Sequence, residues 1–176
     1  MKKIIGLLFA VLFSAGLYAQ EEVIKFLGIP VDGTKQEMIQ KLKSKGFTYN
    51  QREGFLEGEF NGEEVVITVQ TQNNKVWRLF ILDKTSRSEE QIKIRFNKLV
   101  SQFENNGKYI PLKETQTIDE NEDISYEISV HDKQYQANFL SETYGFAWFT
   151  IGELGRGYCI AMFYENPKNA ANGSDL

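Results

Sequence analysis

Two amphipathic helices, each introduced by a capping box and followed by strand-like sequence, constrain the fold of this chain more than any other feature. In the first, Thr34 precedes Glu37 by three positions, which is the spacing of a capping box. An apolar stripe at helical spacing follows, formed by Met38, Ile39 and Leu42. The stretch 24–50 therefore predicts one helix that buries a narrow face.

The second helix is the more strongly patterned of the two. Ser88 and Gln91 form another capping box. The apolar residues that follow recur at i, i+4, i+7, i+8 and i+11, which predicts a buried face along the whole helix. They are Ile92, Phe96, Leu99, Val100 and Phe103.

Between and after the helices, the pattern changes to the two-residue alternation of strands. Asn61-Gly62 separates 55–60 from 65–70, and Asn-Gly is the strongest short hairpin signal because both residues accept positive φ. A second turn at Asn73-Asn74 leads to a strand over 76–82, and 47–50 is a weaker candidate. Further strands are predicted over 124–130, 134–140, 144–151 and 158–164.

This order predicts an α+β fold made of two tandem helix-plus-antiparallel-meander repeats, with the helices packed on one face of the sheet. The repeats span 20–83 and 84–164, after a signal peptide over 1–19 and before a flexible polar tail over 165–176. The element order resembles that of β-lactamase inhibitory proteins, and each repeat resembles the small outer-membrane assembly lipoproteins of the BamE type. The segment FLGIPVDGTKQEMIQKLKSKGF is similar to functionally uncharacterised exported proteins of gut-type Gram-negative bacteria. These resemblances imply the fold and export, and they transfer no catalytic residue.

The first 19 residues predict where in the cell the protein is located. Lys2 and Lys3 precede an apolar run over 4–13, and small residues ending at Ala19 supply a cleavage site, as in a secretory signal peptide. No later stretch reaches about 20 apolar residues, so we expect no membrane span. No cysteine lies near the cleavage site, which disfavours a lipid anchor. We expect a periplasmic or secreted protein.

The charge of the chain argues against nucleic-acid binding. The net charge is −4, with 20 basic and 24 acidic residues. Removal of Lys2 and Lys3 with the signal peptide leaves 18 basic residues, so the mature chain carries about −6. A general nucleic-acid binder needs a basic surface to neutralise phosphates.

Little in the sequence points to catalysis. His131 is the only histidine and sits at a predicted turn, and Cys159 is the only cysteine, in the apolar strand GYCIAMFY. A Ser-His-Asp triad would need a nucleophile elbow, and a zinc site would need more ligands. GELGRG over 152–157 joins two strands, so we interpret it as a hairpin turn and not as a phosphate loop. We predict neither a cofactor nor a catalytic residue, and a carboxylate-based hydrolase is the third alternative.

The acidic stretch 119–123 begins like a calcium-binding loop. Position six of an EF-hand should be Gly and is Ile124, and position twelve should be Glu and is Val130. The EF-hand interpretation therefore fails. A solvated charged loop and a low-affinity calcium site stay as alternatives.

An antiparallel sheet with helices on one side leaves a second face to be explained. In the first repeat we expect Leu56, Phe60, Val65, Ile67, Val69, Trp77, Leu79 and Ile81 to face the helix. In the last two strands we assign the side rich in small residues to the helix, because small side chains allow close packing. That side comprises Gly145, Ala147, Phe149, Ile151, Cys159, Ala161 and Phe163.

The opposite, open face then carries an aromatic cluster, and exposed aromatic and Met residues are typical of binding surfaces. The sequence predicts an exported, non-catalytic module that binds an envelope or secreted protein. The alternative is a small-molecule, lipid or glycan binder, which would need a pocket on the order of a few hundred Å3. The face assignment could also be reversed, or the face covered by a long loop or a homodimer partner. The predicted binding residues are Trp148, Tyr158, Phe146, Met162, Tyr164, Arg78 and Phe80.

Overall fold

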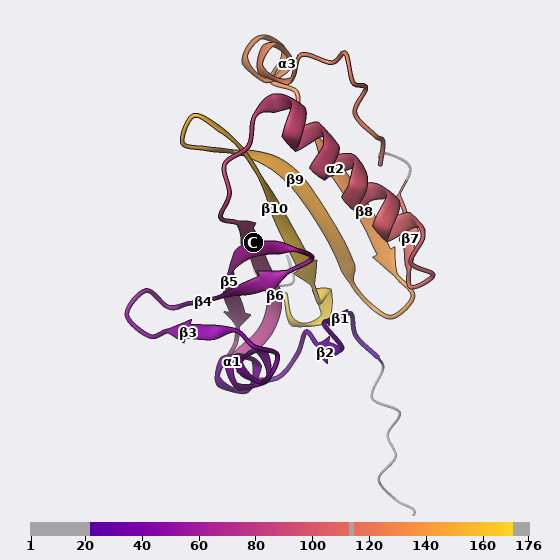
Figure 1. Cartoon of the computed structure of the whole chain (residues 1–176). Helices are drawn as coiled ribbons and strands as arrows, with labels where there is room; N and C mark the ends of the chain where they lie inside the picture. The colour runs from indigo at the N-terminus through magenta and orange to yellow at the C-terminus, as the bar shows by residue number, and fades with distance from the viewer. Residues whose placement is uncertain (1–21, 113–114, 171–176) are drawn as a thin grey trace, which may run out of the picture.

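The computed structural model describes residues 22–112 and 115–170 (Figure 1). The predicted signal peptide over 1–19 and the end of the predicted tail, 171–176, lie outside the described residues. Within these ranges no helix is both long enough and apolar enough to cross a membrane. The helices are α1 (Lys35–Ser44), α2 (Glu89–Glu104), α3 (Ile124–His131) and the short 3-10 helix η1 (Pro167–Asn169). The strands are β1 (Lys25–Phe26), β2 (Ile29–Pro30), β3 (Thr48–Asn50), β4 (Phe55–Phe60), β5 (Glu63–Gln72), β6 (Lys75–Asp83), β7 (Tyr109–Pro111), β8 (Gln136–Ser141), β9 (Phe146–Leu154) and β10 (Gly157–Glu165).

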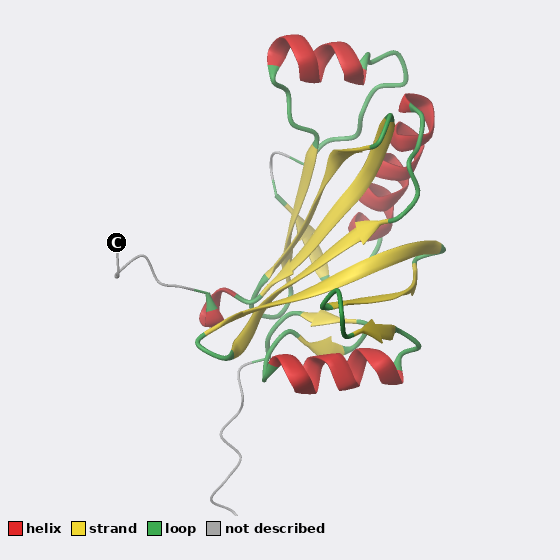
Figure 2. Cartoon of the chain, turned by 90° about the vertical axis from the view of Figure 1, so that its left-hand side faces the viewer, coloured by secondary structure: helices red, strands yellow, loops and turns green. Residues whose placement is uncertain are grey.

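Eight of these strands form one twisted antiparallel sheet, which confirms the predicted α+β class. Their order is β3-β4-β5-β6-β10-β9-β8-β7, and β1 and β2 form a separate small sheet. In each half of the chain the strands therefore run from the edge of the sheet to its centre, where β6 pairs with β10. Helices α1 and α2 contribute to one continuous core on the same face of the sheet. Helix α3 lies at the end of the molecule opposite α1 (Figures 1 and 2).

Both capping boxes are present as predicted. The Thr34 hydroxyl accepts the N–H of Glu37 at 3.3 Å, and the Glu37 carboxylate accepts the N–H of Thr34 at 2.8 Å. The hydrogen bonds that the Glu37 carboxylate accepts from the N–H and the hydroxyl of Thr34 hold the pKa of Glu37 below its ordinary value. Ser88 and Gln91 make the same reciprocal pair at the start of α2. The predicted apolar stripes of both helices are buried.

The predicted hairpin turns are also confirmed. Asn61 and Gly62 join β4 to β5 with φ of +54° and +75°. Asn73 and Asn74 join β5 to β6 with φ of +48° and +62°. Positive φ at both central residues gives the twist that a two-residue hairpin requires, and Asn and Gly tolerate it. The GELGRG segment is a strand-to-strand turn between β9 and β10, as expected.

The predicted strand over 124–130 was wrong, because this segment is helix α3. Ile124, Tyr126, Ile128 and Val130 alternate along the sequence, which suggested a strand. The same residues are also spaced four apart, so Ile124 and Ile128 share the inner side of a helix while Tyr126 and Val130 are exposed. The Asp123 carboxylate caps the helix by accepting the N–H of Tyr126 at 2.8 Å. Local capping thus outweighed the β propensity of the side chains.

Trp77 does not belong to the buried set where we expected it. The register between β5 and β6 shifts after Gln70, so Thr71 pairs with Val76 and Trp77 is an extra, bulged residue. Val76 is therefore fully buried in place of Trp77.

The first part of the predicted flexible tail is tied to the domain by polar contacts. Asn166 is buried, and its side-chain amide donates to the Val31 carbonyl at 2.9 Å. The Asn169 amide donates to the Asp32 carboxylate at 2.7 Å and to the Val76 carbonyl at 2.8 Å. The sequence pattern missed this docking because it uses hydrogen bonds to carbonyl and carboxylate oxygens and not a periodic apolar pattern.

A buried ion network joins α2 to the centre of the sheet. Asp83 and Arg95 are 3% and 6% exposed, and the Arg95 Nε and Nη2 atoms lie 3.2 and 3.4 Å from the Asp83 carboxylate. Arg87 lies 3.4 Å from the same carboxylate and also pairs with Glu63. Burial raises the pKa of Asp83, and the neighbouring arginines oppose that shift.

Candidate binding face

The open face is the side of the sheet that points away from α1 and α2 (Figure 2). Its residues alternate with buried ones along five strands, and the strand register places them side by side. The residues of the open face include Val66, Thr68, Gln70, Arg78, Phe80, Leu82, Gln136, Asn138, Leu140, Phe146, Trp148, Thr150, Ala161, Phe163 and Glu165.

Three aromatic rings cross the middle of the open face in one row. Phe163 of β10 is directly paired with Phe80 of β6 on one side and with Trp148 of β9 on the other. The Trp148 and Phe163 rings stack with centroids 3.8 Å apart and an interplanar angle of 12°. The centroids of Phe80 and Phe163 are 5.0 Å apart. We call Phe80, Phe163 and Trp148 the aromatic row.

A charged pair fixes one end of this row. Glu165 accepts the indole N–H of Trp148 at 2.8 Å and pairs with Arg78 at 2.7 Å. The Arg78 guanidinium also lies 4.0 Å from the centroid of Trp77 and 5.4 Å from that of Phe163. These contacts hold the Trp148 and Arg78 side chains in set orientations, so a partner would find them already positioned.

One donor in this arrangement stays unsatisfied. Among the described residues, Arg78 Nε is the buried side-chain nitrogen or oxygen that lacks a hydrogen-bond partner. An unsatisfied buried donor costs stability, and such costs gather at positions that serve something other than folding.

Apolar side chains extend the open face toward β8. Leu140 and Phe146 are directly paired and are 37% and 38% exposed. Tyr144, in the loop before β9, is 44% exposed, and its ring centroid lies 4.7 Å from the ammonium of Lys168. Together with the aromatic row, they give a continuous apolar and aromatic surface with a charged pair beside it.

The structure brings four of the predicted binding residues together on this face, namely Arg78, Phe80, Phe146 and Trp148. The other three lie on the helix side. Met162 and Tyr164 are 3% and 5% exposed, and Tyr158 is half-buried against the core. Our assignment of Tyr158, Met162 and Tyr164 to the open face was therefore wrong.

The error lies in the phase of β10 alone. Small residues do mark the helix side of β9, where Ala147 is fully buried. Two residues, Gly155 and Arg156, join β9 to β10, so Leu154 pairs with Gly157 and Trp148 pairs with Phe163. Loop length sets the register of a hairpin, and a slip of one residue exchanges the two faces. A count through this turn would have placed Phe163 beside Trp148.

Phe163, Glu165 and Leu140 are among the open-face residues that sequence reasoning missed. Phe163 and Glu165 were missed because the prediction exchanged the two faces of β10. Leu140 gave no separate signal, because it lies next to the fully buried Phe139 near the end of β8.

Neither reactive side chain identified in the sequence is both exposed and part of a wider reactive cluster among the described residues. His131 ends α3 and its Nδ1 lies 3.0 Å from Glu127. Cys159 is buried, as expected from its apolar strand, and burial raises the pKa of its thiol. Within residues 22–112 and 115–170, no three His, Cys, Asp or Glu side chains converge in a way that could hold a metal ion.

The acidic stretch 119–123 is organised around a lysine. Lys93 of α2 is 9% exposed, and its ammonium donates to the carbonyl oxygens of Glu120 at 2.7 Å and Glu122 at 2.8 Å. The Asp119 carboxylate accepts the N–H of Asn121, and Asp123 caps α3. The carbonyl oxygens of this loop therefore bind the ammonium group of Lys93.

We expect Lys93→Met to lower the free energy of unfolding by about 1–3 kcal/mol, since two carbonyl acceptors lose their donor. Urea titration monitored by circular dichroism measures this loss. Lys98→Met on the same helix is the matched control and should change stability by less than about 0.5 kcal/mol. Equal losses in the two variants would show that the loop does not depend on Lys93.

Comparison with known proteins finds no match for this chain. No family model matches the chain, and neither a curated protein nor a solved structure does so.

Proposed function

We propose that this protein is an exported, non-catalytic binding module that holds another envelope or secreted protein on its open face. The aromatic row of Phe80, Phe163 and Trp148, with the Arg78–Glu165 pair at its end, is the observation that carries the proposal. Export rests on the sequence of residues 1–19, which has the charged, apolar and small-residue regions of a signal peptide.

The chemistry of the open face favours a protein partner. Binding energy at protein interfaces is concentrated in Trp, Tyr and Arg residues, which lie in a desolvated centre with a polar rim. Here Trp148 and Arg78 lie beside Phe163, and the polar residues Thr68, Gln70, Gln136 and Asn138 lie toward the two sides of this surface. A broad sheet surface of this kind presents contact area without enclosing a small ligand.

We further propose that the two halves of the chain are tandem copies of one architectural unit, as in β-lactamase inhibitory proteins. Two observations support this proposal. In each half, a helix that carries a capping box precedes four strands of the large sheet. The strand order is also symmetric about the β6–β10 pair. The insertion of α3 between β7 and β8 distinguishes the second half from the first.

Affinity capture followed by calorimetry tests the proposed interaction. The bait is the chain from Gln20, exposed to the envelope and secreted fractions of the native cell. Phe146→Asp and Trp148→Ala are the test variants, and Tyr126→Asp on α3, where Tyr126 is 50% exposed, is the matched control. A protein retained by the parent and control baits should then be purified and titrated against all four chains.

We expect each test variant to weaken binding of the purified partner by at least about 30-fold, the effect of losing one interfacial hot spot. The Tyr126→Asp control should bind like the parent. Circular dichroism must first show that every variant is folded. A partner that binds all four chains equally would contradict the proposal, and so would the absence of any retained protein. A parent chain that sediments as a dimer lost in Phe146→Asp would assign the face to self-association instead.

A further inference from the structure

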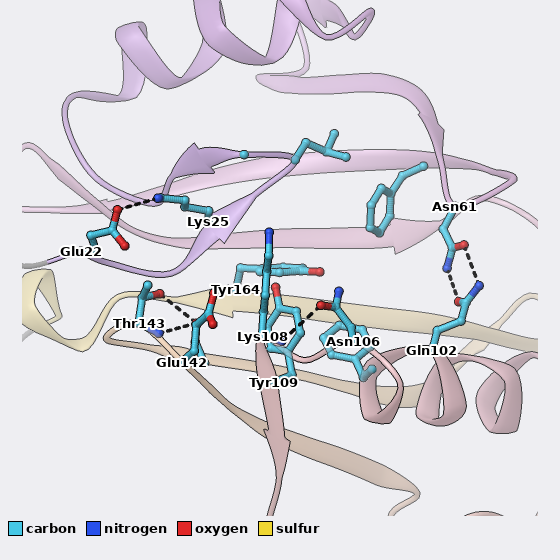
Figure 3. Close-up of a pocket in the computed structure, with 15 residues that line it drawn as sticks. Glu22, Lys25, Asn61, Gln102, Asn106, Lys108, Tyr109, Glu142, Thr143 and Tyr164 are labelled. Carbon is cyan, nitrogen blue, oxygen red and sulfur yellow. Dashed lines mark hydrogen bonds and ion pairs between the residues drawn. The ribbon is translucent and has the colours of Figure 1, made fainter.

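A pocket of about 420 Å3 lies where the two halves of the chain meet (Figure 3). Its walls come from the β1–β2 hairpin, the β4–β5 turn, the end of α2, β7 with the residue before it, and the β8–β9 loop. It is on the helix side of the sheet, because it is lined by Phe103 and Tyr164 of the core. We call it the junction pocket. Its size is typical of a small-molecule site.

Aromatic side chains form the inner surface of the junction pocket. Phe103 lies with its ring centroid 4.7 Å from that of Tyr109, and Phe60 packs at 4.8 Å against Phe26. Tyr164 is buried, and burial raises the pKa of its hydroxyl well above the ordinary value. The tyrosine hydroxyl is therefore a neutral group at physiological pH.

A pair of amides closes one end of the pocket. Asn61 in the β4–β5 turn donates to the Gln102 side chain at 2.8 Å, and Gln102 donates back at 3.3 Å (Figure 3). This reciprocal pair joins the first half of the chain to α2. Asn106 extends the amide-lined wall beyond it.

The charges of the junction pocket balance in a specific way. Glu22 and Lys25 neutralise one another at 2.9 Å. Lys108 and Glu142 make no ion pair with any described residue, although the Glu142 N–H donates to the Lys108 carbonyl at 2.8 Å. Figure 3 shows the Lys108 ammonium extended across the pocket toward the β1–β2 hairpin, away from Glu142. Lys108 and Glu142 thus place one positive and one negative group on the pocket lining, each without an ion-pair partner among the described residues.

The hairpin over this pocket holds a residue in an unfavourable conformation. Leu27 and Gly28 form its two-residue turn with φ of +51° and +79°. Such turns favour Asn, Asp or Gly, and a leucine in the left-handed region is strained. Leu27 is nevertheless 39% exposed and lines the pocket. Strain of this kind is typical of positions that contact ligands.

We propose that the junction pocket binds a zwitterionic amino acid or dipeptide. The carboxylate of the ligand pairs with Lys108 and its ammonium pairs with Glu142, so neither charge is desolvated alone. The apolar part of the ligand contacts Leu27 and Phe60. The pocket lining has no net charge, which disfavours ligands that carry several charges of one sign. The Lys108 ammonium and the Glu142 carboxylate instead match the two opposite charges of a zwitterion.

Isothermal titration calorimetry of the chain from Gln20 tests this proposal. The probes are L-phenylalanine and L-alanyl-L-phenylalanine, with N-acetyl-L-phenylalanine amide and N-acetyl-L-phenylalanine as neutral and anionic counterparts. Lys108→Met and Glu142→Gln are the test variants, and Lys43→Met on α1, outside the pocket, is the matched control.

We expect saturable binding of at least one zwitterionic probe, weakened at least about tenfold in each test variant and unchanged in the control. The neutral and anionic counterparts should bind at least about tenfold more weakly. Absence of saturable binding up to about 10 mM of both zwitterions would overturn the proposal. Equal binding of the counterparts, or of the zwitterion to Lys108→Met, would also overturn it.

Leu27→Asn separates a ligand-contacting role of this residue from a structural one. Asparagine accepts the left-handed conformation, so we expect the melting temperature to rise by about 2–4 °C. The zwitterionic probe should nevertheless bind more weakly, because the apolar contact is lost. A variant that melts higher and binds as the parent does would show that Leu27 plays no part in the pocket.

Discussion

Replacing Arg95 with methionine should lower the free energy of unfolding by about 3 kcal/mol, one of the two largest losses that we expect from any single substitution. The variant leaves Asp83, which is 3% exposed, without its main partner. Breaking a buried pair on one side typically costs about 3–5 kcal/mol, because the remaining charge stays desolvated. Arg87 remains 3.4 Å from the carboxylate, which places the expected loss at the low end of that range.

The loss in Arg95→Met should depend on pH. Burial raises the folded-state pKa of Asp83, and Arg95 is the first of the groups that oppose this rise. Without Arg95, the folded chain binds a proton on Asp83 more tightly than the unfolded chain does. Stability then falls as pH rises from the unfolded pKa through the folded one. The deficit relative to the parent should therefore be smaller near about pH 4.5 than near about pH 7.5, as measured by urea titration at both.

The double variant Asp83→Val with Arg95→Met is the control for this interpretation. It removes both charges and keeps an apolar side chain opposite Val65 in the sheet. A buried pair replaced by apolar residues is often close to neutral, so the double variant should recover to within about 1 kcal/mol of the parent. A double variant as unstable as Arg95→Met would mean that the loss comes from packing and not from the unpaired carboxylate.

Gly145→Ala should be similarly damaging, with an expected loss of about 2–5 kcal/mol. Gly145 has φ of +140°, which an alanine adopts only with strain. A Cβ atom there would lie 2.5 Å from the Glu165 carbonyl oxygen and 2.6 Å from Ile24 Cγ2. The first neighbour is backbone of the central strand and the second is a fully buried side chain, so neither moves easily. Strain and overpacking each cost roughly 1–3 kcal/mol.

Gly107→Ala provides the matched control, because a Cβ atom at that position meets no heavy atom within 4 Å and φ is not positive. It should change the midpoint of urea unfolding little. If both glycine variants unfold at the parent midpoint, the close approach of the N-terminal segment to β10 at Gly145 is not a constraint on the fold.

What the sequence predicts well here is local. A capping box is complete within four residues, and Asn61-Gly62 needs only its own backbone preference, so both appear in the structure where the sequence indicates. Helix α2 is equally clear, because five apolar residues keep one period over its whole length. These features decide the class of the fold without knowledge of any distant contact.

The missed features depend on information that local pattern does not hold. The face of β10 follows from the length of one turn, and so Tyr164 and Phe163 exchanged sides in our prediction. Helix α3 depends on tertiary context as well as on Asp123, since Glu89 of α2 accepts the N–H of Ile124 at 2.8 Å. The docking of Asn166 joins residues 135 positions apart. None of these contacts leaves a periodic signal.

The position of β10 in the middle of the sheet has a consequence for the order of folding. Among the ten strands of the described residues this one is the last along the chain, yet it lies between β6 and β9. Until residues 157–165 are available, β6 and β9 are open edges that invite pairing with other chains. Contacts of such long sequence separation also form slowly. A chain that is synthesised from its N-terminus cannot complete this sheet early. The sheet stays incomplete until residues 157–165 are available. The same delay exposes any prematurely terminated product to aggregation and proteolysis.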